Sequence, residues 1–336
     1  FFGRWLDKPI HLIRILWSRL KKTIKTTGKI VLGFFACLPY TLDRKTDYLA
    51  CVFSLGDTLI AGGLLPVFQA RYPEKQVKVL VREAHRWVTE FYPDRNYELI
   101  FVSPFRAKII RAYFNVTTRR LSSRLRLCLP DKTLYSPDYE GVQRILSLGL
   151  IPSYKRAFSL PTTAEFKIPK YPKLTYAQRD TLLQKYGIVP RKTVILAPYS
   201  VTLEMFDYTP LFTRLANILK AKGYHVLTNT TDDRIIVGTE AFRADIQDTV
   251  CLAQERNLWV ISVRSGLCDL LRFADCQVTV LYPSEFHQRL FSLVRMFGER
   301  DRLSEIVVLP ETNDLKMILS EEDENENTPD QRPSTL

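Results

Sequence analysis

The order of hydrophobic and polar positions divides the chain into four sections. Residues 1–44 are predicted to form a helical extension, because apolar residues recur on one face at steps of three or four. Residues 45–165 and 166–319 each alternate short apolar strands with amphipathic helices. Residues 320–336 are acidic and have no apolar period, so we expect a disordered tail. The apolar face of the extension comprises Leu6, Ile10, Ile13, Trp17 and Leu20.

Strands that alternate with helices are typical of parallel β-α-β units. The first section has expected strands over Tyr48–Ser54, Gln76–Val81 and Tyr97–Val102, with a tight turn at Gly56 and Asp57. A proline-rich stretch over 152–174 is predicted to be the interdomain linker. The fold class is therefore α/β, with two Rossmann-like parallel-sheet domains that face a cleft. The strands expected in the second section are Thr193–Ala197, Tyr224–Thr228, Leu258–Val263 and Gln277–Tyr282, with a helix over Pro210–Lys222.

The charge of the chain indicates an anionic partner. Its 336 residues carry a net charge of +12, which suits nucleic acid, phospholipid headgroups or phosphorylated small molecules. The sequence contains no known RNA- or DNA-binding module, so nucleic acid is not expected. Basic residues on the polar side of the extension suit either an acidic membrane surface or a solvated face of a helix packed on the protein. They are Arg4, Lys8, Arg14, Lys21, Lys22 and Lys25.

Cysteine and histidine positions argue against a disulfide framework and a metal centre. The six cysteines form no C-x-x-C pair and lie mostly among apolar neighbours, which indicates reduced, buried thiols in a cytosolic protein. His85, His225 and His287 lack the spacing of metal ligands, and no D-x-D pair stands in the loop that would hold an ion under a diphosphate. We expect no metal and no cofactor.

The first candidate for chemistry follows the first expected strand. Gly56 lets the backbone approach a ligand closely, and Asp57 stands at a helix start at the carboxyl end of the strand. A carboxylate there could accept the proton of an acceptor hydroxyl as a general base. It could equally cap the helix, a position that Asp favours. Thr58 belongs to the same acceptor-side loop.

Donor-binding candidates follow the strands of the second section. Pro198, Tyr199 and Ser200 end one strand, and Ser200 could contact a phosphate or a ribose. Ser265 and Gly266 open a helix and leave backbone amides for a pyrophosphate, while Arg264 adds a bidentate donor. Each has a plainer structural alternative: a strand-to-helix turn for the first loop and a salt bridge for Arg264. The remaining candidates are Asp269 in the same helix, Thr228 and Asn229 at a strand end, and Thr239 in a loop.

A cluster of basic residues, with no acidic residue among them, occurs over residues 106–126. It could face lipid phosphates or a pyrophosphate-linked acceptor, or form a solvated surface. Its members are Arg106, Lys108, Arg111, Arg119, Arg120, Arg124 and Arg126.

Two stretches resemble a known family. Ser54-Leu55-Gly56-Asp57-Thr58-Leu59, with Arg71-Tyr72-Pro73 and the strand over 77–82, is similar to the amino-terminal half of the lipopolysaccharide heptosyltransferases of glycosyltransferase family nine. The resemblance implies that Asp57 is the general base and that the reaction inverts the anomeric carbon. The Ser265-Gly266 pair also matches, but that family has Asp where Arg264 stands and His where Asp269 stands. This segment looks more like a branch of glycosyltransferase-like proteins from surface-polysaccharide loci.

These observations predict a glycosyltransferase of the bacterial cell envelope. It would transfer a sugar from a nucleotide-sugar to a polysaccharide or lipid-linked glycan acceptor, in the cytoplasm or at the inner face of the plasma membrane. The alternative is a non-catalytic protein of the same fold that acts as a scaffold or partner subunit in a polysaccharide assembly complex.

Overall fold

The computed structural model describes residues 23–24, 27–43, 45–93, 95–116, 125–127, 139–200, 206–312 and 315–319. It separates into two compact units, one of residues 1–141 with 152–167 and the other of residues 142–151 with 168–336. The expected apolar face over residues 6–20 and the expected tail over 320–336 lie outside the described residues. Among the described helices, none is both long and apolar enough to cross a bilayer.

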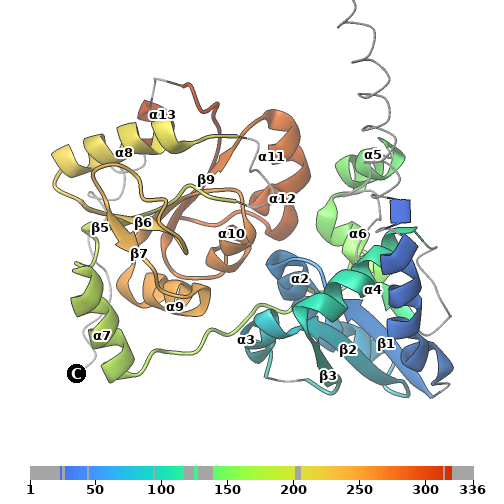
Figure 1. Ribbon diagram of the computed structural model, residues 1–336. Coiled ribbons are helices and arrows are strands. Elements are labelled where there is room, and N and C mark those ends of the chain that lie inside the picture. The colour runs from blue at the N-terminus through green and yellow to red at the C-terminus, as the bar shows by residue number, and fades with distance from the viewer. Residues whose placement is uncertain are drawn as a thin grey trace, which may run out of the picture. The chain divides into compact units, whose positions relative to one another are not determined.

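The first unit is built on a four-stranded parallel sheet. Its strands run in the order β3-β2-β1-β4, so the chain passes to the other side of β1 after β3. A helix over residues 27–42 precedes the sheet and runs beside α4 (Figure 1). The strands are β1 (Thr46–Cys51), β2 (Gln76–Arg82), β3 (Glu98–Val102) and β4 (Leu125–Leu127), and the helices are α2 (Leu55–Arg71), η1 (Glu83–His85), α3 (Arg86–Glu90) and α4 (Pro104–Val116).

The second unit is built on a six-stranded parallel sheet. The order β10-β9-β8-β5-β6-β7 is the Rossmann order, in which the third strand along the chain forms one edge and the fourth returns beside the first. The strands are β5 (Thr193–Ala197), β6 (His225–Asn229), β7 (Glu240–Phe242), β8 (Trp259–Val263), β9 (Gln277–Tyr282) and β10 (Leu303–Val307).

Helices cover both faces of this second sheet. Leu211, Leu215 and Leu219 recur along α8 at a spacing of four and pack into one buried cluster with Val194 and Ile261 of the sheet. Figure 1 shows α8 and α13 on that face and α9 and α10 on the other. The helices are α7 (Tyr176–Tyr186), α8 (Thr209–Ala221), α9 (Ile246–Arg256), α10 (Gly266–Leu271), α11 (Glu285–Phe291), α12 (Leu293–Phe297) and α13 (Lys316–Leu319).

The structure corrects two local expectations. The stretch expected to be linker from Pro152 onward begins inside α6 (Leu150–Ala157), because a proline in the first turn of a helix has no amide that needs an intrahelical partner. The helix α5 (Tyr139–Leu148) precedes it, and both helices cross the division between the units. The tight turn expected at Gly56 and Asp57 is instead the first turn of α2. The α/β class with two parallel sheets is confirmed.

Candidate functional site

The first candidate site is the start of α2, directly after β1. Ser54 is the N-cap of this helix, and its amide donates to Oδ2 of Asp57 at 2.8 Å. The Ser54 hydroxyl also donates to Oδ2 at 2.7 Å, and the Asp57 amide donates back to that hydroxyl oxygen at 3.3 Å. This reciprocal pair is a capping box, in which two amides at a helix start are satisfied at once. Asp57 therefore performs the capping role that the sequence left open.

A tyrosine from α6 holds the other oxygen of the same carboxylate. Tyr154 is fully buried, and its hydroxyl donates to Oδ1 of Asp57. A carboxylate oxygen can accept two hydrogen bonds, and among the described residues one donor lies on Oδ1 and two lie on Oδ2. The carboxylate is thus oriented from two sides, with acceptor capacity remaining on Oδ1. Its role as a general base stays a prediction.

The next residue of α2 joins this site to the end of β2. The Thr58 hydroxyl donates to the carbonyl oxygen of Ser54 at 3.1 Å and lies 2.9 Å from Nδ1 of His85. Burial, followed by the nearby Arg82, lowers the pKa of His85 to about 4, so the imidazole is neutral at pH 7. His85 is therefore a second titratable group at the same end of the sheet as Asp57.

In the second unit, the candidate loops meet where the strand order reverses. The first loop follows β5 and the second follows β8, and these two strands are neighbours in the sheet. The hydroxyl of Ser200 donates to the carbonyl oxygen of Arg264 at 3.0 Å, which ties the two loops together. Pro198 is buried, whereas Ser200 is half-buried. In open α/β sheets, ligands bind at such a switch point, outside the carboxyl ends of the strands.

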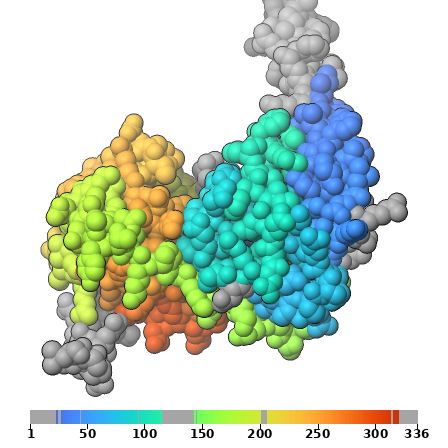
Figure 2. All heavy atoms as spheres, turned by 90° about the horizontal axis from the view of Figure 1, so that it is seen from below, coloured from blue at the N-terminus to red at the C-terminus, as the bar shows by residue number. Residues whose placement is uncertain are grey.

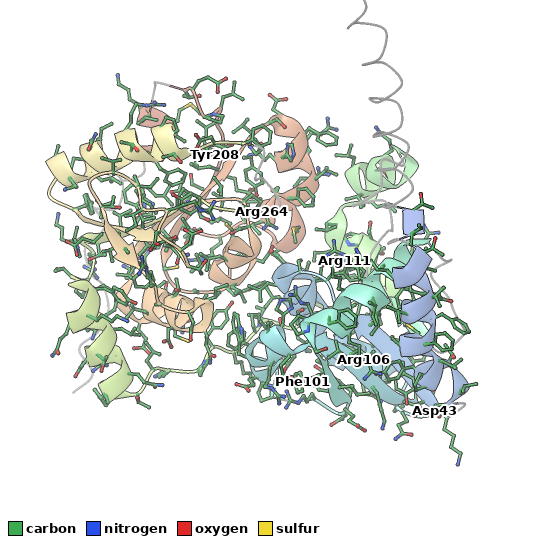
Figure 3. The ribbon with its side chains drawn as sticks, in the orientation of Figure 1. Asp43, Phe101, Arg106, Arg111, Tyr208 and Arg264 are labelled. Carbon is green, nitrogen blue, oxygen red and sulfur yellow. The ribbon has the colours of Figure 1, made fainter. Side chains whose placement is uncertain are left out.

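The Arg264 side chain has partners other than the expected phosphate. Its guanidinium forms a bidentate ion pair with Asp269, with Nη2 at 2.6 Å from Oδ1 and Nη1 at 3.2 Å from Oδ2. Nη1 also donates to the carbonyl oxygen of Ser265 at 2.6 Å, and Nε donates to that of Phe291 at 2.8 Å. The group lies inside the second unit (Figure 3), with Sδ of Met296 3.9 Å from Nη2.

These contacts match the salt-bridge alternative for Arg264, and donor binding by Arg264 and Asp269 stays a prediction. A guanidinium has five N–H donors, and the five contacts of Arg264 engage them all within its own unit. Burial has the largest single effect and lowers the pKa of Arg264, but the charge and hydrogen bond of Asp269, together with Tyr282 and Cys268, hold that pKa above its usual value. The two positions at which the segment departs from the heptosyltransferase pattern are thus each other's partners. The pair fixes the backbone of the loop rather than offering a free cation.

Ser265 and Gly266 begin α10 beside this pair. Ser265 has extended backbone and makes no side-chain capping bond, and its hydroxyl lies 3.7 Å from Sγ of Cys268. The Cys268 thiol in turn contacts the Ser262 hydroxyl at 3.4 Å. The contact of these two loop residues with a pyrophosphate stays a prediction.

The candidates after β6 are tied to one another. The buried Thr228 hydroxyl lies 2.5 Å from that of Thr239 and accepts from the Ile236 amide at 3.2 Å, so both threonines shape the loop between β6 and β7. Asn229 ends β6 and is half-buried. In the same region, the guanidinium of Arg234 lies over the Tyr199 ring, 4.4 Å from its centroid. The loops after β5 and β6 are therefore in contact through Tyr199 and Arg234.

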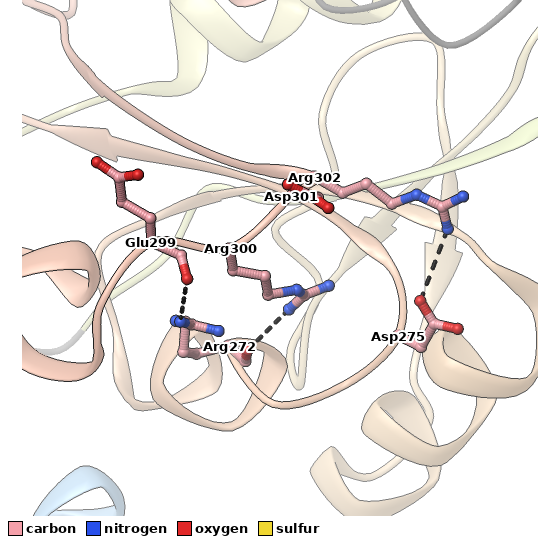
Figure 4. Close-up of a pocket in the computed structure, with 6 residues that line it drawn as sticks. All are labelled: Arg272, Asp275, Glu299, Arg300, Asp301 and Arg302. Atoms are coloured by element: carbon pink, nitrogen blue, oxygen red, sulfur yellow. Dashed lines mark hydrogen bonds and ion pairs between the residues drawn. The ribbon is translucent and has the colours of Figure 1, made fainter. Parts of the chain in front are cut away.

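A separate depression lies at the opposite ends of the strands. It is lined by Arg272, Asp275, Glu299, Arg300, Asp301 and Arg302 (Figure 4). Asp275 precedes β9 and Arg302 precedes β10, so this depression lies at the amino-terminal ends of these strands. The loops of the switch point follow the carboxyl ends of β5 and β8. Arg272 and Arg300 donate to backbone carbonyl oxygens and Arg302 lies 3.7 Å from Asp275, which indicates a structural role. Within the described ranges, no group of three or more His, Cys, Asp or Glu side chains could hold a metal ion.

Comparison with solved structures shows that the fold is similar to the GT-B fold of solved glycosyltransferases. The E. coli ADP-heptose lipopolysaccharide heptosyltransferase II is similar over 83% of this chain and 98% of its own, with a TM-score of 0.54 and 13% identity. A glycosyl transferase family 9 protein from Veillonella parvula is similar over 83% and 92%, with a TM-score of 0.52 and 13% identity. No protein-family model and no curated protein sequence matches the chain.

Proposed function

We propose that this protein is a glycosyltransferase that uses a nucleotide-sugar donor. The observation that carries the proposal is the contact between Ser200 and Arg264, which joins two loops at the switch point of a sheet with Rossmann order. The nucleoside diphosphate part of the donor would lie over this point, near Ser200 and the backbone of Ser265 and Gly266. The similarity of the fold to heptosyltransferase II supports the same assignment.

The chemistry that suits the first unit is general-base catalysis by Asp57. An acceptor hydroxyl oxygen would attack the anomeric carbon, the bond from that carbon to the diphosphate oxygen would break, and the hydroxyl proton would pass to Oδ1 of Asp57. Ser54 and Tyr154 would hold the carboxylate in place. The resemblance to glycosyltransferase family nine implies inversion, and the reaction would need no metal.

The acceptor would bind to the first unit, near Gly56 and Thr58. We propose a glycan of a cell-surface polysaccharide or its lipid-linked precursor as the acceptor. The sequence motifs resemble those of lipopolysaccharide heptosyltransferases and of glycosyltransferase-like proteins from surface-polysaccharide loci, which supports this class of acceptor. The reaction would then take place at the cytosolic face of the membrane.

One observation favours the alternative of a non-catalytic binding protein. The guanidinium of Arg264 is engaged within its own unit, so it contributes no free positive charge for a leaving diphosphate. A scaffold of this fold could still bind a nucleotide and would not turn it over.

A ligand panel followed by a turnover assay separates the two functions. Nucleoside diphosphates and nucleotide-sugars that bind the native state raise the melting temperature. The donor that raises it most is then incubated with glycan acceptors, and release of the nucleoside diphosphate is measured. Release by the wild-type protein and its loss in Asp57→Asn support the transferase. A thermal shift without release or transfer, for every donor that binds, supports the scaffold.

A further inference from the structure

The helix over residues 27–42 is apolar on two opposite sides. Its inner side carries Gly33, Cys37 and Tyr40, all buried against the first unit. A Cβ atom on Gly33 would lie only 2.5 Å from the carbonyl oxygen of Ile109, so the absence of a side chain allows this helix to lie directly on α4. The inner side therefore accounts for one apolar face of the helix.

The outer side is apolar and exposed. Val31, Phe35 and Leu42 share this side at 100° per residue, and their exposed fractions are 48%, 61% and 68%. Leu32 flanks this side with 49% exposed. Together, these four residues form the outer apolar face. Figure 2 shows residues of this helix at the surface of the first unit. A helix that is apolar all round is normally buried, so this face needs a partner.

The charges of this helix and of α4 beneath it are positive. No acidic residue occurs between positions 24 and 42, and Lys25 and Lys29 lie in that stretch. Helix α4, on which this helix lies, contains no acidic residue either and carries Arg106, Lys108 and Arg111. It begins with Pro104 and Phe105, of which Phe105 is 65% exposed, and the Arg106 guanidinium lies 5.3 Å from the centroid of the Tyr40 ring.

The sequence that precedes the helix is also rich in basic residues. Residues 1–22 contain one acidic residue, Asp7, and six basic ones, which are Arg4, Lys8, Arg14, Arg19, Lys21 and Lys22. Exposed aliphatic and aromatic side chains surrounded by cations match the boundary between headgroups and acyl chains of an anionic bilayer. An apolar protein partner would not account for the excess of positive charge.

We propose that the outer apolar face docks on the surface of an anionic lipid bilayer. Val31, Phe35 and Leu42 would enter between the headgroups, while lysine and arginine side chains contact the lipid phosphates. The helix would then lie in the plane of the interface, with its inner side still on α4. This inference does not depend on the proposed transferase activity, because it requires neither a donor nor Asp57.

Vesicle flotation with the full chain tests the docking. Wild-type protein is expected to float with vesicles of equal parts phosphatidylglycerol and phosphatidylcholine, to float less with pure phosphatidylcholine, and to be released by salt. The variant Leu32→Ser with Phe35→Ser is expected to lose about tenfold or more in partitioning onto the anionic vesicles. The control is Val189→Ser with Ile168→Ser, which changes apolar residues with similar exposed fractions of 51% and 67% in the second unit. The control should float like the wild type.

Two further measurements give each result a clear meaning. Melting temperatures of both variants should match the wild type, since all four side chains are exposed. Phe35→Trp keeps the face apolar, and its added fluorescence should shift to shorter wavelength on mixing with anionic vesicles. The proposal is overturned if the Leu32→Ser/Phe35→Ser protein floats like the wild type, if neutral and anionic vesicles bind equally, or if the emission of the Phe35→Trp protein does not move. It is also overturned if the wild-type protein does not bind vesicles and is a dimer in solution while the Leu32→Ser/Phe35→Ser protein is a monomer. A second copy of the chain would then cover the face.

Discussion

Arg264 and Asp269 form a bidentate ion pair whose two side chains are only 10% and 6% exposed. Removing one member of a buried pair leaves an uncompensated charge, which typically costs about 3–5 kcal/mol of stability. We therefore expect Arg264→Met and Asp269→Leu each to lower the free energy of unfolding by that order. The double variant should lose much less than the sum, because neither charge is then left alone. Urea unfolding of the four proteins measures this difference.

A surface pair provides the control for that cycle. Lys167 lies 2.8 Å from Glu165, and both side chains are more than half exposed. Lys167→Met should change stability little, since exposed ion pairs gain little over their hydrated charges. Additive losses in the Arg264 and Asp269 single variants, with no coupling, would contradict the structural role of this pair.

The sequence predicted seven of the ten described strands, because their signals are local, and missed β4, β7 and β10. Apolar runs such as Thr193–Ala197 and Gln277–Tyr282 are fully or nearly fully buried strands, and they coincide with β5 and β9. The expected strand over Tyr48–Ser54 was too long, since β1 ends at Cys51 and Ser54 already caps α2. Burial extends through residues 52 and 53, so apolar pattern alone could not mark the end of the hydrogen-bonded ladder.

The site could be predicted only where its contacts are close in sequence. Ser54 and Asp57 are three residues apart, and a capping role for Asp57 was open from its position at the helix start, although Ser54 proves to be the N-cap residue. Tyr154 contacts Asp57 from 97 residues away, within a proline-rich stretch interpreted as linker. Similarly, the pairing of His85 with Thr58 depends on β1 and β2 being neighbours. Nothing in the local pattern marks either long-range contact.

The role of Asp57 as general base and the role of Ser54 as helix cap can be distinguished by experiment. Asp57→Asn keeps an oxygen that can accept from Ser54 and removes the basic carboxylate. If Asp57 is the general base, turnover should fall about 10²–10⁴-fold while the donor-induced thermal shift is retained. Ser54→Ala removes the capping hydroxyl instead and should cost about 1 kcal/mol of stability. Turnover should be largely preserved, because the amide of residue 54 and the Tyr154 hydroxyl still hold the carboxylate. Full turnover by the folded Asp57→Asn protein would falsify the assignment of the base.

The thiols should be inert in the folded protein. The five cysteines of the described ranges are buried: Cys37, Cys51, Cys251, Cys268 and Cys276. Burial raises the pKa of Cys37 to about 11 and that of Cys276 to about 12, so very little reactive thiolate exists at pH 7. Alkylation with iodoacetamide, mapped by mass spectrometry, should modify these five only after urea unfolds the chain. Rapid modification of Cys37 in the native protein would mean that the helix over 27–42 detaches readily from α4.

Protonation of His85 should couple stability to acid pH. Its pKa is lowered by burial from the usual 6.5 to about 4, so the unfolded chain binds a proton at a higher pH than the folded protein does. The stability associated with the neutral imidazole is complete above pH 6.5, is lost progressively as pH falls toward 4, and changes no further below that. The loss over this window is at most roughly 3 kcal/mol.

A variant isolates this contribution from the other titrating groups. His287 has a pKa that burial also lowers, so the wild-type pH dependence alone does not identify His85. His85→Gln keeps a polar partner for the Thr58 hydroxyl and cannot titrate. Free energies of unfolding measured in urea between about pH 4 and pH 7 should fall less steeply for this variant, because one proton-binding site of the unfolded chain is gone. Equal slopes for the two proteins would show that His85 is protonated as easily when folded as when unfolded.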